Sequence, residues 1–250
     1  MKLLNALFVA FAAAFVWVLS LATPQEDPTL TELWEPVPPQ IQASALGSPP
    51  SDALSLLTGP DLADWRHVDG RTAEWALEDG VVTVEPGTGD LTTLRDFGDV
   101  QLHIEWRTPE QVVGSGQDAG NSGVFLMSRY EIQVLNSYDN ATYSNGQAGA
   151  IYKQHIPLVN ASRPPGEWQS YDVVFAAPRF GADGAVEQPA IMTVFHNGVL
   201  IHDRVRLRGT TTYIGEPEYE QHGEREPLLL QDHGNRVSFR NLWIREVSAF

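Results

Sequence analysis

The chain has 250 residues, of which 42% are hydrophobic and 10% aromatic, enough for one sizeable hydrophobic core. Acidic residues outnumber basic residues by 32 to 16, and no run of Lys or Arg interrupts the net charge of −16. Because binding to a phosphate backbone needs clustered cations, we do not expect nucleic acid as a partner. The sequence contains no cysteine, which excludes disulfides, thiol catalysis and a lipid-modified cysteine.

Residues 1–22 have the composition of an export signal, with one lysine, an apolar run from Leu3 to Leu21, and small residues Ser20 and Ala22 before Thr23. The apolar run approaches the roughly 20 residues that span a bilayer, so an uncleaved membrane anchor is the alternative. We expect a periplasmic or secreted protein that contacts a membrane only if this segment is retained. Residues 23–52 are rich in proline, which removes backbone donors, and they predict an irregular lead-in or linker.

From residue 53 to residue 250, short apolar runs alternate with Gly, Pro, Asn and Asp, as in a domain built from strands. Apolar and polar residues alternate strictly over 100–107, which is the period of a half-buried strand. Residues 190–205 predict a hairpin that turns at Asn197-Gly198. Further strands are predicted at 81–84, 123–128, 130–135, 169–177, 227–232 and 236–247. The sequence therefore predicts an all-β, antiparallel two-sheet sandwich.

One predicted strand carries an unusual set of polar side chains. Alternation over 129–134 sends the apolar residues to the core and places Arg129, Glu131 and Gln133 together on the outer face. Glu105 lies on the outer face of the strand 100–107 in the same way. An ordinary solvated face would explain this pattern, but the crowding of charged and amide groups favours a concave binding surface.

Loops and strand entrances supply the remaining candidates for a binding site. They are Asn121 between two glycines, Lys153 and His155 after a polar loop, Trp168 before a strand, and Gln231. Trp168 has two interpretations, a core residue or a flat platform for a sugar ring. His233 follows Asp232 in a predicted turn, where it is either a surface residue or a proton carrier that titrates near neutral pH.

Known cofactor motifs are missing from the sequence. The seven histidines form no HExxH or other spaced metal signature, and there is no GxSxG, P-loop or dinucleotide fingerprint. We therefore expect no catalytic metal and no cofactor. A structural Ca²⁺ held by loop carboxylates would need no readable motif and stays open.

Six segments in chain order resemble the 3-keto-disaccharide hydrolase domain family, namely 56–65, 120–137, 149–154, 164–173, 196–201 and 228–246. The resemblance implies the concanavalin A-like lectin/glucanase jelly roll. In laminarinase-type β-glucanases of that fold, one strand carries Glu-x-Asp-x-x-Glu, whereas this chain has Glu131-Ile-Gln133-Val-Leu-Asn136. Because a retaining glycosidase needs two carboxyl groups about 5–5.5 Å apart, ordinary retaining hydrolysis is in doubt.

The resemblance also implies a substrate that needs only one base, a glycoside oxidised at C3. We hypothesise that Glu131 or His233 removes the C2 proton and that Arg129, Lys153 or Gln133 holds the enolate oxygen. Elimination of the aglycone and addition of water then give net hydrolysis. Substrate-binding roles fall to Arg129, Glu105, Asn121, Lys153, His155, Trp168 and Gln231. The alternative is a non-catalytic, lectin-like domain in which Trp168 or Tyr138 stacks on a sugar.

Overall fold

The structure is a computed structural model that describes residues 28–42, 45 and 47–247. Contacts divide the chain into two units, Met1–Gln40 and Ile41–Phe250. The described part of the first unit contains a one-turn 3-10 helix, η1 (Pro28–Thr31). The expected export signal lies outside the described residues. None of the helices in the described part of the chain is long and apolar enough to cross a membrane.

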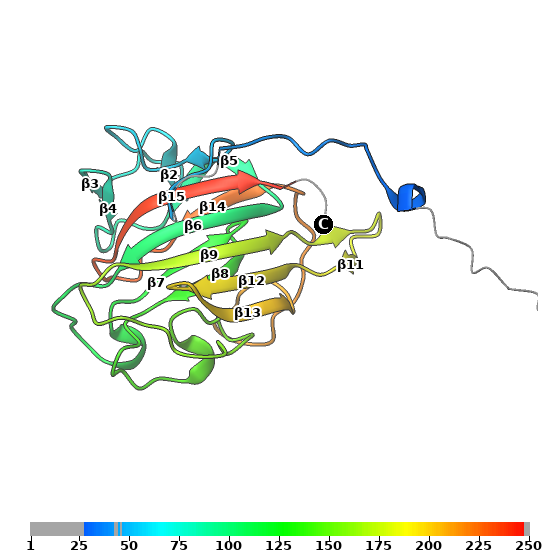
Figure 1. Cartoon of the computed structure of the whole chain (residues 1–250). Coiled ribbons are helices and arrows are strands. Elements are labelled where there is room, and N and C mark those ends of the chain that lie inside the picture. Colours follow the sequence, from blue (N-terminus) through cyan, green and yellow to red (C-terminus); the bar gives the residue numbers. More distant parts are fainter. Residues whose placement is uncertain (1–27, 43–44, 46, 248–250) are drawn as a thin grey trace, which may run out of the picture. The chain divides into compact units, whose positions relative to one another are not determined.

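The regular secondary structure of the second unit consists almost wholly of strands, most of them in two sheets (Figure 1). The larger sheet contains β1 (Leu54–Ser55), β3 (Ala76–Glu78), β4 (Val81–Thr83), β6 (Val100–Arg107), β9 (Gln169–Ala176), β12 (Ile191–His196), β13 (Val199–Arg206) and β15 (Ser238–Glu246). The smaller sheet contains β2 (Trp65–His67), β5 (Leu91–Phe97), β7 (Ser122–Leu126), β8 (Tyr130–Val134) and β14 (Glu226–Leu230). Outside these sheets lie a two-stranded ribbon and two 3-10 turns, β10 (Arg179–Phe180), β11 (Val186–Gln188), η2 (Gly116–Asp118) and η3 (Ser144–Gly146).

The strand order is β13-β12-β9-β6-β15-β4-β3 in the larger sheet, with β1 paired to β15, and β2-β5-β14-β7-β8 in the smaller one. All pairings within the two sheets are antiparallel. Alternate residues of each sheet fill the core between them, as Ile104 and Trp106 of β6 and Ile132 of β8 do. The predicted all-β sandwich is confirmed.

The hairpin and one strand show where local sequence signals succeed and where they fail. Asn197 and Gly198 have φ of 52° and 79° between β12 and β13, as a tight hairpin turn requires. The strand β5 was not predicted. Its apolar residues Leu91, Leu94 and Phe97 recur every third position, and a register shift interrupts its pairing with β14. A bulge of this kind removes the strict alternation by which a strand is recognised.

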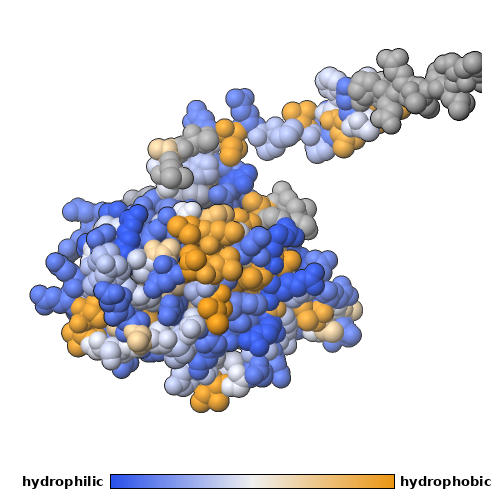
Figure 2. Space-filling view, turned by 60° about the horizontal axis from the view of Figure 1, so that its bottom comes forward, coloured by the Kyte–Doolittle hydropathy of each residue, from blue (hydrophilic) through white to orange (hydrophobic). Residues whose placement is uncertain are grey.

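Two residues on the N-terminal side of residue 53, Gly47 and Asp52, are bound to β15. Gly47 accepts hydrogen bonds through its carbonyl from Asn241 Nδ2 and Trp243 Nε1, at 2.7 and 3.1 Å, and Asp52 pairs with Arg245. Gly47 therefore lies on the outer face of β15. Elsewhere on the unit, hydrophobic residues gather in a patch that hydrophilic residues surround (Figure 2).

Candidate active site

Glu131 and Gln133 occupy the outer face of β8, as alternation predicted, but this face is not wet. Their exposed fractions are 4% and 1%. Two distant segments pair with the edge of β8, and Tyr152 and Thr211 from these segments also line the cavity over its outer face. Tyr152 N donates to Glu131 O at 3.3 Å, and Glu131 N donates to Thr211 Oγ1 at 3.0 Å. The outer face of β8 is thus the floor of a cavity whose rim is open to solvent.

The cavity over this face has a volume of about 260 Å³. Five of the residues that line it were predicted from the sequence, namely Asn121, Glu131, Gln133, Gln231 and His233. The other four are Phe125, Tyr152, Thr211 and Tyr213, which sequence reasoning missed. Tyr152 lies within 149–154, one of the six segments that carry the family resemblance, but nothing local indicated that its ring would reach β8.

Burial raises the pKa of Glu131 to about 8, and the negative charge of Asp90 adds to this effect. In the described residues, no hydrogen bond or ion pair reaches the Glu131 carboxyl group, so nothing offsets the loss of water. Gly123 makes room for the group, because a Cβ at that position would meet Glu131 Oε1 at 2.8 Å. The site therefore holds a carboxyl group whose conjugate base is unusually strong for glutamate.

A pair of tyrosines stands beside Glu131. The hydroxyl groups of Tyr143 and Tyr152 are 2.7 Å apart. Burial first, then the hydrogen bond to Tyr143 and the charge of Glu131 among other groups, raise the pKa of Tyr152 well above its ordinary value. The Tyr152 phenol consequently keeps its proton at any physiological pH and can donate it within the cavity.

The amide side chains of the cavity differ in whether they have hydrogen-bond partners within the protein. Gln133 Nε2 donates to Asn121 Oδ1 at 3.0 Å, and Asn121 Nδ2 donates to Gln117 O at 2.7 Å. These two amides are held in place by the protein. By contrast, Gln231 Oε1 is buried without a hydrogen-bond partner among the described residues. Gln231 is thus free to bind a ligand.

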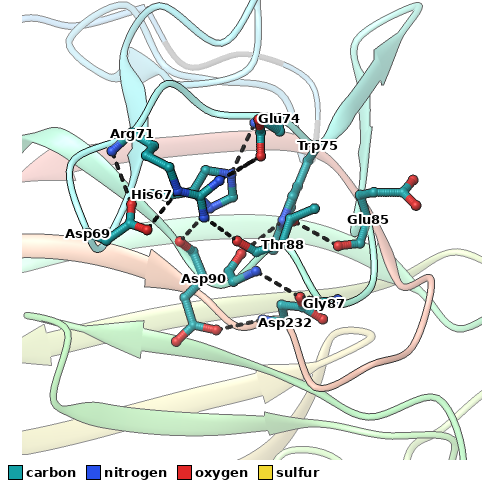
Figure 3. A network of polar contacts seen from close by, with 11 residues as sticks. His67, Asp69, Arg71, Glu74, Trp75, Glu85, Gly87, Thr88, Asp90 and Asp232 are labelled. Atoms are coloured by element: carbon teal, nitrogen blue, oxygen red, sulfur yellow. Dashed lines mark hydrogen bonds and ion pairs between the residues drawn. The ribbon is translucent and has the colours of Figure 1, made fainter.

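His233 lies exposed at the rim of the cavity, on a turn that Asp232 anchors. The Asp232 carboxylate accepts hydrogen bonds from Gly87 N and Gly89 N at 2.7 and 3.0 Å, and Asp232 N donates to Asp90 Oδ1 at 2.8 Å (Figure 3). Asp232 is therefore structural, while the His233 ring remains accessible at the entrance.

Five of the predicted substrate-binding residues do not line this cavity. Arg129 presents only its carbonyl to Thr211 N, and its Nε is buried without a partner among the described residues. Lys153 Nζ donates to Tyr213 O at 2.6 Å and lies 4.2 Å from the Tyr213 ring centroid, so it supports the wall from behind. His155 Nε2 donates to Arg206 O at 2.8 Å.

Glu105 and Trp168 belong to the other sheet. Glu105 points outward from β6, and Trp168 precedes β9, so both line a separate cavity across the core from Glu131. Alternation predicted correctly that Glu105 faces outward. It could not tell which sheet that outer face belongs to, because sheet membership depends on long-range strand pairing.

Comparison with known proteins agrees with this architecture. Residues 52–245 match the model of the 3-keto-alpha-glucoside-1,2-lyase-like domain family. A "putative glycosyl hydrolase" of Parabacteroides distasonis shares 46% identity with a TM-score of 0.84, covering 88% of this chain and 97% of its own. A second protein of that description and organism shares 19% identity with a TM-score of 0.58, covering 84% and 100%. No curated protein matches the chain.

The fold is an antiparallel two-sheet β-sandwich, and it is shared with proteins that are described as "putative glycosyl hydrolases". The chain belongs to the 3-keto-alpha-glucoside-1,2-lyase-like domain family, because the match spans most of its length. The resemblance drawn from the sequence segments is thereby confirmed.

Proposed function

We propose that the protein cleaves 3-keto-glycosides by elimination across C1 and C2 followed by hydration, with Glu131 as the base. One observation carries the proposal. The cavity is lined by a single carboxyl group among the described residues, and that group has a pKa of about 8. A lone carboxyl does not suit a double displacement, which needs two. It does suit the removal of a proton from carbon.

The C3 ketone makes the C2 hydrogen acidic, since the resulting carbanion is delocalised as an enolate. Glu131 takes that proton, the electron pair forms the C1–C2 double bond, and the bond from C1 to the aglycone oxygen breaks. A raised pKa strengthens the carboxylate as a base toward this weak carbon acid. Its apolar and aromatic neighbours, Phe125, Tyr152 and Tyr213, keep water from restoring the ordinary pKa.

Two further groups complete the reaction. Tyr152 gives its hydroxyl proton to the departing aglycone oxygen. Gln231 lines the cavity, and its side-chain Nε2, which makes no hydrogen bond among the described residues, donates to the enolate oxygen. In the second half, water adds its oxygen to C1 and its proton to Tyr152, while Glu131 returns the proton to C2. Both residues regain their starting state, and 3-keto-glycoside plus water gives 3-keto-sugar plus alcohol.

This assignment favours Glu131 over His233 as the base. His233 is exposed at the rim, where water solvates its ring, whereas Glu131 lies on the floor of the cavity. We assign the enolate oxygen to Gln231 and not to the groups expected from the sequence. The side chains of Arg129 and Lys153 do not line the cavity, and the Gln133 amide is already bound to Asn121.

The test uses a chromogenic 3-keto-glucoside and its unoxidised parent. We expect aglycone release from the keto compound alone, slower release when C2 carries deuterium, and a loss of about 10²- to 10⁴-fold in Glu131→Gln. Glu78→Gln, which changes an exposed glutamate of β3, is the matched control. Equal release from both compounds, or full activity in Glu131→Gln, would refute the mechanism.

We also propose export of the protein by the segment 1–22, on the strength of its composition. N-terminal sequencing of the mature protein, isolated from the periplasm or medium of the producing cell, tests this. A mature chain that begins at Thr23 supports export with cleavage, and an intact Met1 in the cytoplasm contradicts it.

A further inference from the structure

A second cavity lies on the outer face of the eight-stranded sheet and has a volume of about 360 Å³. Its walls come from β6, β9 and β15 and from the loops before β9 and after β12. Ile104 and Trp106, the neighbours of Glu105 in β6, face the core with no exposed surface. This cavity is thus on the opposite side of the sandwich from Glu131 and takes no part in the chemistry proposed there.

Rigid partners hold the walls of this second cavity. The Trp168 ring lies under the Arg240 guanidinium at 4.0 Å. Arg240 Nε donates in turn to Glu105 Oε2 at 2.6 Å, and Asn241 Nδ2 donates to Glu105 Oε1 at 2.9 Å. Asp172 is fixed by His103, whose Nδ1 lies 2.7 Å from Asp172 Oδ1. A site with walls held in this way loses little entropy when a ligand binds.

Several polar atoms of the lining are left without a protein partner. Among the described residues, no hydrogen bond is made by Asp172 Oδ2, Ser170 Oγ or the two Nη atoms of Arg240. Arg163 uses Nη1 to reach Trp168 O at 2.9 Å and keeps Nη2 free. Donors and acceptors therefore surround the cavity together, which is what a ligand rich in hydroxyl groups requires.

The charges of the lining indicate that the ligand is neutral. Two cations, Arg163 and Arg240, oppose two anions, Glu105 and Asp172, in a chain whose net charge is −16. A site for an anion or a cation would carry an excess of the opposite charge. The half-buried Trp168 ring has two guanidinium groups against it, Arg240 at 4.0 Å and Arg107 at 4.7 Å, and the part of the indole that they leave uncovered offers an amphipathic surface for the apolar C–H groups of a sugar.

We propose that this cavity is a second, non-catalytic carbohydrate site, which binds one neutral pyranose unit of an oligosaccharide. It does not depend on the reaction at Glu131. It also reconciles the two interpretations of the sequence, since the catalytic and the lectin-like features occupy different sheets. The site would keep the enzyme on a glycan while the opposite face acts on oxidised glycosides.

Calorimetric titration of the full chain tests the proposal, with unoxidised cellotriose and maltotriose as neutral probes and trigalacturonate as the charged one. We expect a neutral probe to bind with a Kd of about 1 mM or tighter, and Trp168→Ala to weaken binding at least about tenfold. Arg163→Ala, a change at an exposed position, should weaken it without affecting the fold. Glu131→Gln should bind as the wild type does.

Three results would overturn the proposal. They are the failure of a neutral probe to bind at a concentration of about 10 mM, tighter binding of trigalacturonate than of the neutral probes, and binding that survives both Trp168→Ala and Arg163→Ala. Loss of binding in Glu131→Gln would place the sugar in the other cavity. In ¹⁵N-labelled protein, the indole signal of Trp168, identified by its absence in Trp168→Phe, should shift with the probe. Turnover of a 3-keto-glucoside is measured separately, so failure of the reaction leaves this test intact.

Discussion

Replacing Glu131 with glutamine should stabilise the protein at alkaline pH while it removes activity. The substitution keeps the size of the side chain and removes the charge that must form inside the cavity. Glu131 is 4% exposed, and among the described residues no donor reaches its carboxylate. Burial, aided by the charge of Asp90, raises its pKa from 4.5 to about 8.

The sign follows from proton binding. The folded state holds the Glu131 proton more tightly than the unfolded state, so this group's contribution to stability is fully present below pH 4.5 and is lost as the pH rises through 8. The interval between these pKa values corresponds to about 5 kcal/mol of unfolding free energy. Glutamine does not titrate. Between pH 5 and pH 9, Glu131→Gln should therefore gain about 4 kcal/mol over the wild type.

Urea unfolding followed by circular dichroism at pH 5, 7 and 9 measures this difference. Each variant is compared with the wild type at the same pH, because other groups titrate in both proteins. Glu78→Gln, the exposed control, should track the wild type across the range. If the advantage of Glu131→Gln is the same at pH 5 and pH 9, then Glu131 titrates normally and the basis for its role as a strong base is wrong.

Three further results are expected. The kcat/KM of the wild type for a 3-keto-glucoside should rise with pH and level off above about 8, as Glu131 loses its proton; a flat profile from pH 6 to 9 would contradict this. Tyr152→Phe should slow the release of a poor leaving group, such as methanol, more than that of nitrophenol, and equal slowing would exclude the phenol as the acid. The pKa of Glu105 is shifted in the opposite direction from that of Glu131. Burial acts to raise it, but hydrogen bonds from Asn241 and Arg240 outweigh burial, so the net pKa is lowered. Glu105→Gln should lose stability relative to the wild type above pH 4.5 and approach it in acid, as thermal unfolding at pH 3 and 7 would show.

The sequence by itself was sufficient to predict the two layers of the fold and the side of each recognised strand that faces the core. Side chains alternate along a strand with a period of two, so the apolar half of residues 100–107 and 129–134 identified the core-facing sides directly. It also identified the hairpin at Asn197-Gly198, because a positive φ is a local requirement. The bulged strand β5 escaped prediction, since its residues follow no such period.

For the site, the sequence determined that Glu131 and Gln133 share one face and that Asn121, Gln231 and His233 are polar residues next to strands. Only the tertiary structure decided that these five meet in one cavity, because β14 lies between β5 and β7 through long-range pairing.

The tertiary structure also decided the chemistry of Glu131. Its raised pKa depends on the exclusion of water by residues as distant as Thr211, which lies 80 positions along the chain. Glu105 and Trp168 were separated from Glu131 for the same reason, since no local pattern states which sheet a strand joins. Alternation is a property of neighbouring residues, whereas burial and proximity are properties of the whole packed chain.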